Sequence, residues 1–153
     1  MMIAPAARSR ATLGASKVGR WSTIVSDPYR QGMKNVRATV YNHYVRVDHP
    51  RSFIFVSGQV SRDGDGNQVG TGSMLEQTRQ CIRNIEKSLT AAGGTLADIV
   101  WTTVYTTDMR EFRQIVAARE EFFKDHLPTS TMVEVAHLAD PGLMIEIQVI
   151  AAV

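Results

Sequence analysis

The sequence lacks the features that would place it in several classes of protein. Its 153 residues contain a single cysteine, Cys81, so neither a disulfide within the chain nor a cysteine-based metal cluster can form. No stretch approaches the ~20 apolar residues that a membrane-spanning helix requires. The net charge is only +2, from 17 basic and 15 acidic residues, which gives no strongly basic surface. We therefore predict a globular cytoplasmic protein with no metal site and with neither membrane nor nucleic acid as a partner.

Acidic residues are missing from the first 26 residues, a segment rich in Ala and Ser whose charged side chains are Arg8, Arg10, Lys17 and Arg20. An acid-free, Arg- and Ser-rich start is typical of organelle targeting sequences. The alternative, which we favour, is a flexible tail. We predict an N-terminal extension over residues 1–36 and one domain over residues 37–153, and organelle targeting stays open.

From residue 37 onward, periodicity and turn signals predict an α+β fold. The expected elements are strands 37–47 and 53–60, a helix between 73 and 93, a strand 99–105, a helix from 108 that ends before 128, and strands 130–138 and 143–151. Each helix start has the spacing of a capping box, in Ser73 with Glu76 and in Asp108 with Glu111. This order predicts a mixed sheet of about six strands that ends in a hairpin, with both helices on one face.

The face of the sheet away from the helices is expected to carry carboxylates. Alternation in the last predicted strand assigns Glu146 to this face, and alternation in the preceding strand assigns Ser130, Met132 and Glu134 to it as well. Glu146 is therefore expected beside Met132. Two interpretations stay open: an ordinary solvated surface, or a face that packs against a copy of itself. In a partly dry cleft between copies, a carboxylate could move protons near neutral pH.

Short motifs along the chain add a second kind of information. In order, they are Phe55-Val-Ser-Gly-Gln59, Gln77-Thr-Arg79, Ala91-Ala-Gly-Gly94, Thr102-Thr-Val-Tyr105, Val133-Glu-Val135 and Ile145-Glu-Ile147. Taken together and at this spacing, they resemble the RidA/YjgF family from about residue 37 to the end. The resemblance implies a chorismate-mutase-like fold and a homotrimeric barrel with clefts between subunits. It also implies hydrolysis of reactive enamines and imines, such as 2-aminoacrylate, to a carbonyl product and ammonia without a cofactor.

The resemblance assigns catalytic roles to three positions of this sequence. Glu146 falls at the family's glutamate that orients the attacking water. Tyr44 falls at a cleft tyrosine on the first strand, and Ser57 falls with Gly58 at the Ser-Gly pair that shapes the cleft. We expect Glu146, Ser57 and Tyr44 to be catalytic and Gly58 to contact the substrate.

Three further substrate-binding positions differ from the family pattern. Ser130 stands where active members have the arginine that holds the substrate carboxylate, Met132 where many have cysteine, and Val116 where many have asparagine. A serine hydroxyl cannot replace a charged guanidinium fork, and losing such a contact costs about 2–4 kcal/mol of binding. We therefore expect a substrate other than 2-aminoacrylate, more apolar or bulkier. The alternative is a non-catalytic trimeric member that binds or senses a small ligand.

Arg119 interrupts the apolar stripe of the second predicted helix. A long cationic side chain in such a place commonly extends to solvent, with its charged head in water. The other possibility is that Arg119 reaches the cleft as a substitute cation.

Overall fold

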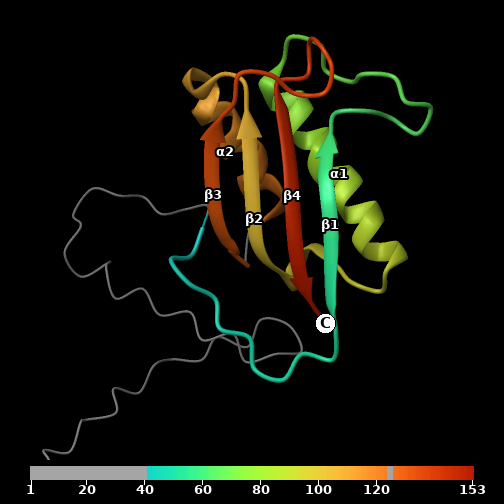
Figure 1. Cartoon of the computed structure of the whole chain (residues 1–153), viewed down its shortest axis with the longest axis vertical. Helices are drawn as coiled ribbons and strands as arrows, with labels where there is room; N and C mark the ends of the chain where they lie inside the picture. The colour runs from blue at the N-terminus through green and yellow to red at the C-terminus, as the bar shows by residue number, and fades with distance from the viewer. Residues whose placement is uncertain (1–40, 124–125) are drawn as a thin grey trace, which may run out of the picture.

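The computed structural model describes residues 41–123 and 126–153. A four-stranded sheet forms one layer, and two helices cover one of its faces (Figure 1). The elements are β1 (Phe53–Val60), α1 (Met74–Ala91), the 3₁₀ turn η1 (Leu96–Asp98), β2 (Ile99–Thr106), the 3₁₀ turn η2 (Met109–Glu111), α2 (Phe112–Phe122), β3 (Thr129–Glu134) and β4 (Ile145–Ala152). The predicted α+β class and the placement of both helices on one face are confirmed.

The strand order is β1-β4-β2-β3, with β4 antiparallel to β1 and β2, and β3 parallel to β2 at the edge. The sheet is mixed, as predicted, because α2 carries the chain back so that β3 starts at the same end as β2. The predicted terminal hairpin is wrong. Residues 135–144 carry the chain past β2, so β3 and β4 are not neighbours. The turn signals at residues 139–142 mark a bend, but they do not determine which strand lies beside which.

Four strands, not about six, form the sheet in the part of the chain that the structure describes. Residues 37–40 of the first predicted strand lie outside the described residues. Residues 41–47 are irregular and touch the sheet through one parallel bridge between Asn42 and Thr129. The strand prediction is therefore wrong for residues 41–47, although their composition favours strand.

The helix boundaries follow the local signals closely. Oγ of Ser73 accepts a hydrogen bond from the backbone N–H of Glu76 at the start of α1. The helix ends just before Gly93, whose φ of 84° is the left-handed conformation that glycine favours. Between these ends, the stripe facing the sheet is fully buried and consists of Cys81, Ile82, Ile85 and Leu89. Asp108 caps η2 rather than α2, so the second α-helix begins one turn later than predicted.

Within residues 41–123 and 126–153, no helix combines the length and the apolar character that crossing a bilayer demands.

Candidate functional site

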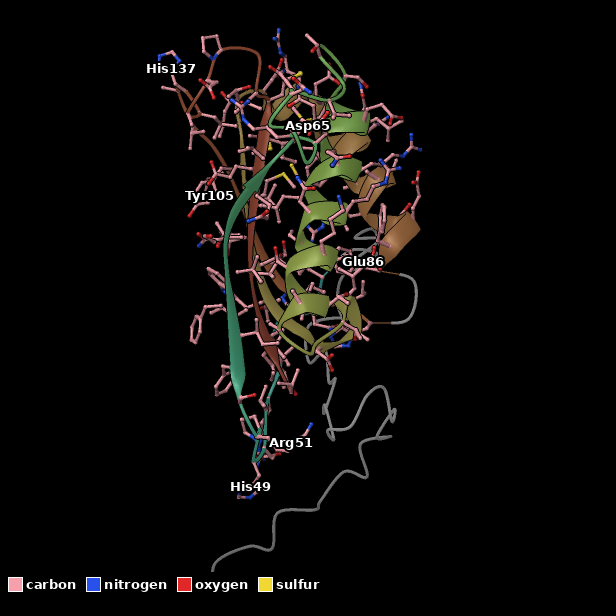
Figure 2. All side chains as sticks on the ribbon, turned by 90° about the vertical axis from the view of Figure 1, so that its right-hand side faces the viewer. His49, Arg51, Asp65, Glu86, Tyr105 and His137 are labelled. Atoms are coloured by element: carbon pink, nitrogen blue, oxygen red, sulfur yellow. The ribbon has the colours of Figure 1, made fainter. Side chains whose placement is uncertain are left out.

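The two faces of the sheet have different surroundings. Ile145, Ile147 and Val149 of β4 are at most 3% exposed beneath the helices, so Glu146 between them lies on the opposite face, as predicted. Figure 2 shows the sheet from its edge, with Glu86 on α1 at one side and Tyr105 projecting from the other. Tyr105 is the β2 partner of Glu146, and this uncovered side is called the open face below.

On the open face, the Glu146 side chain lies directly against Gly58. A β-bulge between Val56 and Gln59 takes Ser57 and Gly58 out of the regular β1–β4 pairing. A Cβ atom on residue 58 would lie only 1.7 Å from Oε1 of Glu146. Only glycine leaves room for the carboxylate in this position. The structure therefore brings Glu146, Gly58 and the exposed Ser57 together, as the resemblance implies.

Tyr44 does not join this group within one chain. The irregular segment that contains it is fixed by the bridge from Asn42 to the start of β3 and by a 2.9 Å hydrogen bond from the backbone of Ser52 to the last residue of the chain. Both contacts lie at the end of the sheet where β1, β2 and β3 begin (Figure 1). Glu146 lies toward the other end, and Tyr44 is 38% exposed.

Ser130 and Met132 face the helix layer, which corrects the prediction that placed them on the open face with Glu146. β3 pairs in parallel with β2, so Met132 lies beside the fully buried Val104 and packs against the core. Glu134 also points toward the helix side, where it accepts a hydrogen bond from the backbone of Met109. Alternation predicted the wrong face because β3 carries apolar residues on both of its faces. Val133, which was expected toward the helices, lies on the open face and is 39% exposed.

The side chain opposite Ser130 is Arg119 of α2. Its Nη1 donates to Oγ of Ser130 at 2.9 Å, and its Nη2 is 3.4 Å from Oγ1 of Thr102. The guanidinium carbon lies 5.8 Å from the centre of the Phe123 ring, within the range of a cation–π contact. Arg119 is only 2% exposed, so the commoner expectation that it extends to solvent is wrong. Burial lowers the pKa of Arg119 to about 10, and the side chain remains charged at neutral pH.

Val116 is half-buried and lies on the same side of α2 as Arg119, three residues earlier. Met132, the other apolar residue at these positions, packs against the core beneath the helices. Residues Val116, Arg119, Ser130 and Met132 are called the edge group below.

In the described residues no metal-binding cluster is found, and the hollow that the structure shows lies away from the predicted site. No three His, Cys, Asp or Glu side chains in residues 41–123 and 126–153 lie close enough to hold a metal ion. A hollow of about 400 Å³ lies beside the segment between β3 and β4, where Thr107, Asp140 and Gly142 contribute to its lining. None of the predicted site residues lines it.

Comparison with known proteins identifies the family. Residues 32–153 match the family described as endoribonuclease L-PSP. The human protein named 2-iminobutanoate/2-iminopropanoate deaminase is 32% identical over 72% of this chain and 78% of its own length. A Rid family protein of Yersinia pestis, YyfB, has a TM-score of 0.76 at 28% identity, covering 86% of this chain and 98% of that one. The YjgF gene product of E. coli has a TM-score of 0.61 at 34% identity, covering 71% and 87%. The chain belongs to the RidA/YjgF family.

In this RidA/YjgF chain, the predicted site residues thus form two separate groups. Ser57, Gly58 and Glu146 lie on the open face over β1 and β4. The edge group lies on the helix side, at the edge strand β3, and β2 stands between β3 and β4. A small ligand held by one group cannot reach the other within a single chain.

The RidA/YjgF resemblance did not assign the contact between Arg119 and Ser130. The sequence does hold a signal for it, because a charged residue at an apolar position of α2 must find buried hydrogen-bond acceptors or reach water. Which acceptors it finds depends on the register of β3, and that register is not visible in the sequence.

Proposed function

We propose that this protein hydrolyses reactive enamines or imines, releasing ammonia and a carbonyl product. The observation that carries the proposal is the position of Glu146, whose carboxylate lies on the open face with Gly58 directly beneath it. The name of the human relative, 2-iminobutanoate/2-iminopropanoate deaminase, supports the same chemistry.

The reaction needs few groups, because an imine carbon is already electrophilic. An enamine first takes a proton on carbon and becomes an imine. Glu146 accepts a proton from water as the water oxygen bonds to the imine carbon, and the nitrogen gains a proton. The resulting carbinolamine then loses ammonia as its hydroxyl proton leaves and the carbonyl forms. One water is consumed for each ammonia released, with no change in oxidation state.

The active assembly in this proposal is a homotrimer. Its open faces turn toward one another, and a cleft forms where the Glu146 group of one subunit meets the edge group of the next. Exposed aromatic side chains on the open face support this arrangement, since Phe55 is 74% exposed and Phe53 is 48% exposed. The separation of the two groups within one chain supports it as well.

The edge group favours a substrate larger than 2-aminoacrylate. Met132 and Val116 are apolar and half-buried where many relatives carry polar side chains. Such a wall stabilises an apolar substituent on the imine by about 0.8 kcal/mol for each methylene group removed from water.

The test is imine hydrolysis by the purified full chain. Imines are generated in solution by an amino-acid oxidase, and semicarbazide captures whatever the protein does not hydrolyse. We expect the wild type to suppress the semicarbazone signal and the Glu146→Gln variant to lose this activity by about 100-fold or more. Glu86→Gln, an exposed change on α1 far from the open face (Figure 2), is the matched control and should be unaffected.

Absence of turnover on every imine, or full activity in Glu146→Gln, would overturn the proposal. Tight binding of a keto acid without any turnover would instead identify a non-catalytic ligand-binding member. The family description also names an endoribonuclease, and a net charge of +2 gives little attraction to a phosphate backbone.

A further inference from the structure

The backbone that leads into β4 is held by a side chain from α1. Gln77 lies in the first turn of this helix and is fully buried. Its Oε1 accepts a hydrogen bond from the backbone N–H of Met144 at 2.9 Å, and its Nε2 donates to the carbonyl oxygen of Gly142 at 2.8 Å. A backbone N–H can only donate and a carbonyl can only accept, so these partners fix the orientation of the amide. Both ends of the amide therefore bind one short segment, residues 142–144.

The same segment is also fixed from the side of the sheet. The carbonyl oxygen of Met144 accepts hydrogen bonds from the backbone N–H of Thr107 at 3.0 Å and from the hydroxyl of Thr106 at 3.2 Å. The N–H of Met144 is bound by Gln77 on the helix. Two supports from different elements therefore set the place where the chain enters β4.

Glu146 follows this segment by two residues and lies where the sheet pairing ends. Its pair with Val60 is the last of the β1–β4 ladder, and one further pair ends the β2–β4 ladder. The ends of strands open more readily than their centres. The place of the Glu146 carboxylate against Gly58 therefore depends on an anchor beyond the ladder, and Gln77 supplies this anchor.

We infer that Gln77 is a positioning residue for Glu146: its amide holds residues 142–144 and so keeps the Glu146 carboxylate against Gly58. This inference rests on the proposed function, in which that carboxylate takes a proton from the attacking water. Gln77 belongs to the helix layer, whereas Glu146 lies on the open face, so Gln77 acts through the backbone and touches no substrate.

The main test variant is Gln77→Met, which keeps the length of the side chain and removes both of its hydrogen bonds. Its matched control is Thr78→Val on the same helix. The Thr78 hydroxyl is also fully buried, and it donates within α1 to the carbonyl of Met74 at 2.7 Å. Both variants lose buried hydrogen bonding and therefore stability, but only Gln77→Met releases the start of β4. Thermal melting and oligomeric state are compared for all the proteins.

The first measurement needs no turnover. In full-length protein labelled with ¹³C-glutamate, the Cδ resonance of Glu146, assigned by its absence in Glu146→Gln, reports the surroundings of the carboxylate. This resonance should shift in Gln77→Met and keep its wild-type position in Thr78→Val. Hydrogen exchange at the backbone amides of residues 144–147 should become about 10-fold faster or more in Gln77→Met alone.

The second measurement is the kinetics of imine hydrolysis. In Gln77→Met, kcat should fall by about 10- to 100-fold while KM changes little, because Gln77 affects the reacting group and not the binding of substrate. Thr78→Val should keep the wild-type kcat. A role in stability alone would change the amount of folded protein in both variants and would leave the kcat of the folded protein unchanged.

Gln77→Asn is a second variant, for the case in which Gln77→Met does not fold. Its side chain is one methylene group shorter, so the amide stays polar but is drawn back from both Gly142 and Met144. We expect the same shift of the Glu146 resonance, faster exchange and a fall in kcat. An unchanged resonance with unchanged exchange in folded Gln77→Asn would contradict the positioning role.

Failure of this inference is distinguishable from failure of the proposed function. An unchanged Glu146 resonance or an unchanged kcat in folded Gln77→Met, or an equal effect of Thr78→Val, overturns the positioning role even if the wild type hydrolyses imines. A shifted resonance and faster exchange in Gln77→Met, with Thr78→Val unaffected, support the role even if no imine is turned over by the wild type, and only the deaminase proposal then fails.

Discussion

Gly58 and Glu146 are in direct contact across the β1–β4 pair, and the contact exists because residue 58 has no side chain. A Cβ atom there would lie 1.7 Å from Oε1, 2.6 Å from Cδ and 2.9 Å from Cγ of Glu146. All three are atoms of one flexible side chain, not of the backbone. A larger residue at position 58 would therefore displace the carboxylate rather than the strand.

This contact predicts that Gly58→Ala inactivates the protein without unfolding it. The added methyl group forces Glu146 into another rotamer, which moves the carboxylate away from its place above the bulge. Because catalytic groups must be placed within a fraction of an ångström, we expect imine hydrolysis to fall by about 100-fold. The melting temperature should change by only a few degrees.

The control for Gly58→Ala is Gly64→Ala. Nothing lies within 4 Å of a Cβ atom on Gly64, and its backbone is not left-handed. Gly64→Ala should keep full activity. Wild-type activity in Gly58→Ala would show that the position of the Glu146 carboxylate does not matter for hydrolysis.

Local signals in the sequence were sufficient to predict both helices and the boundaries of α1, although α2 begins one turn later than its signal suggested. Ser73, Asp108 and Gly93 each act through a backbone group that is a few residues away, so their effect is visible in a short window. The placement of Glu146 on the open face follows from the same short-range periodicity.

Features that depend on residues far apart in the sequence could not be predicted from such local signals. The helix-facing side of β3 is set by its register against β2, where Val104 pairs with Met132. Both faces of β3 carry apolar residues, so alternation alone gave the wrong side. Likewise, His126 is buried with its ring near the carbonyl oxygen of Ile99. Each of these outcomes depends on partners far away in the sequence.

Phe55→Glu should prevent assembly of the proposed trimer. The Phe55 ring is 74% exposed on the open face, and burying such a ring between subunits would contribute about 1.5–3 kcal/mol in each copy. Glutamate removes this contribution and adds three like charges to the interface. Light scattering after size exclusion should show a monomer and little imine hydrolysis, because the cleft between subunits is lost.

The matched control for Phe55→Glu is Phe112→Glu. Phe112 lies at the start of α2, on the helix side, and is 45% exposed. The Phe112→Glu substitution should leave both the oligomeric state and the activity unchanged. A wild-type trimer in Phe55→Glu would mean that the open face does not form the interface.

Because the Cys81 thiol is buried, we expect the protein to lose stability at alkaline pH. Burial, with a smaller contribution from the charge of Glu146, raises the pKa of the Cys81 thiol from its ordinary value of 9.0 to about 12. Well below pH 9.0 the thiol is protonated in both the folded and the unfolded chain, and its contribution to the free energy of unfolding is fully present. As the pH rises from 9.0 toward 12, the unfolded chain loses the proton while the folded chain keeps it, so the free energy of unfolding falls by about 1.4 kcal/mol per pH unit. Urea titrations at matched protein concentration should therefore show the wild type losing about 2 kcal/mol more than Cys81→Ala between about pH 8 and about pH 10.5. Equal losses in the two proteins would show that the thiol ionises as readily in the folded state as in the unfolded chain.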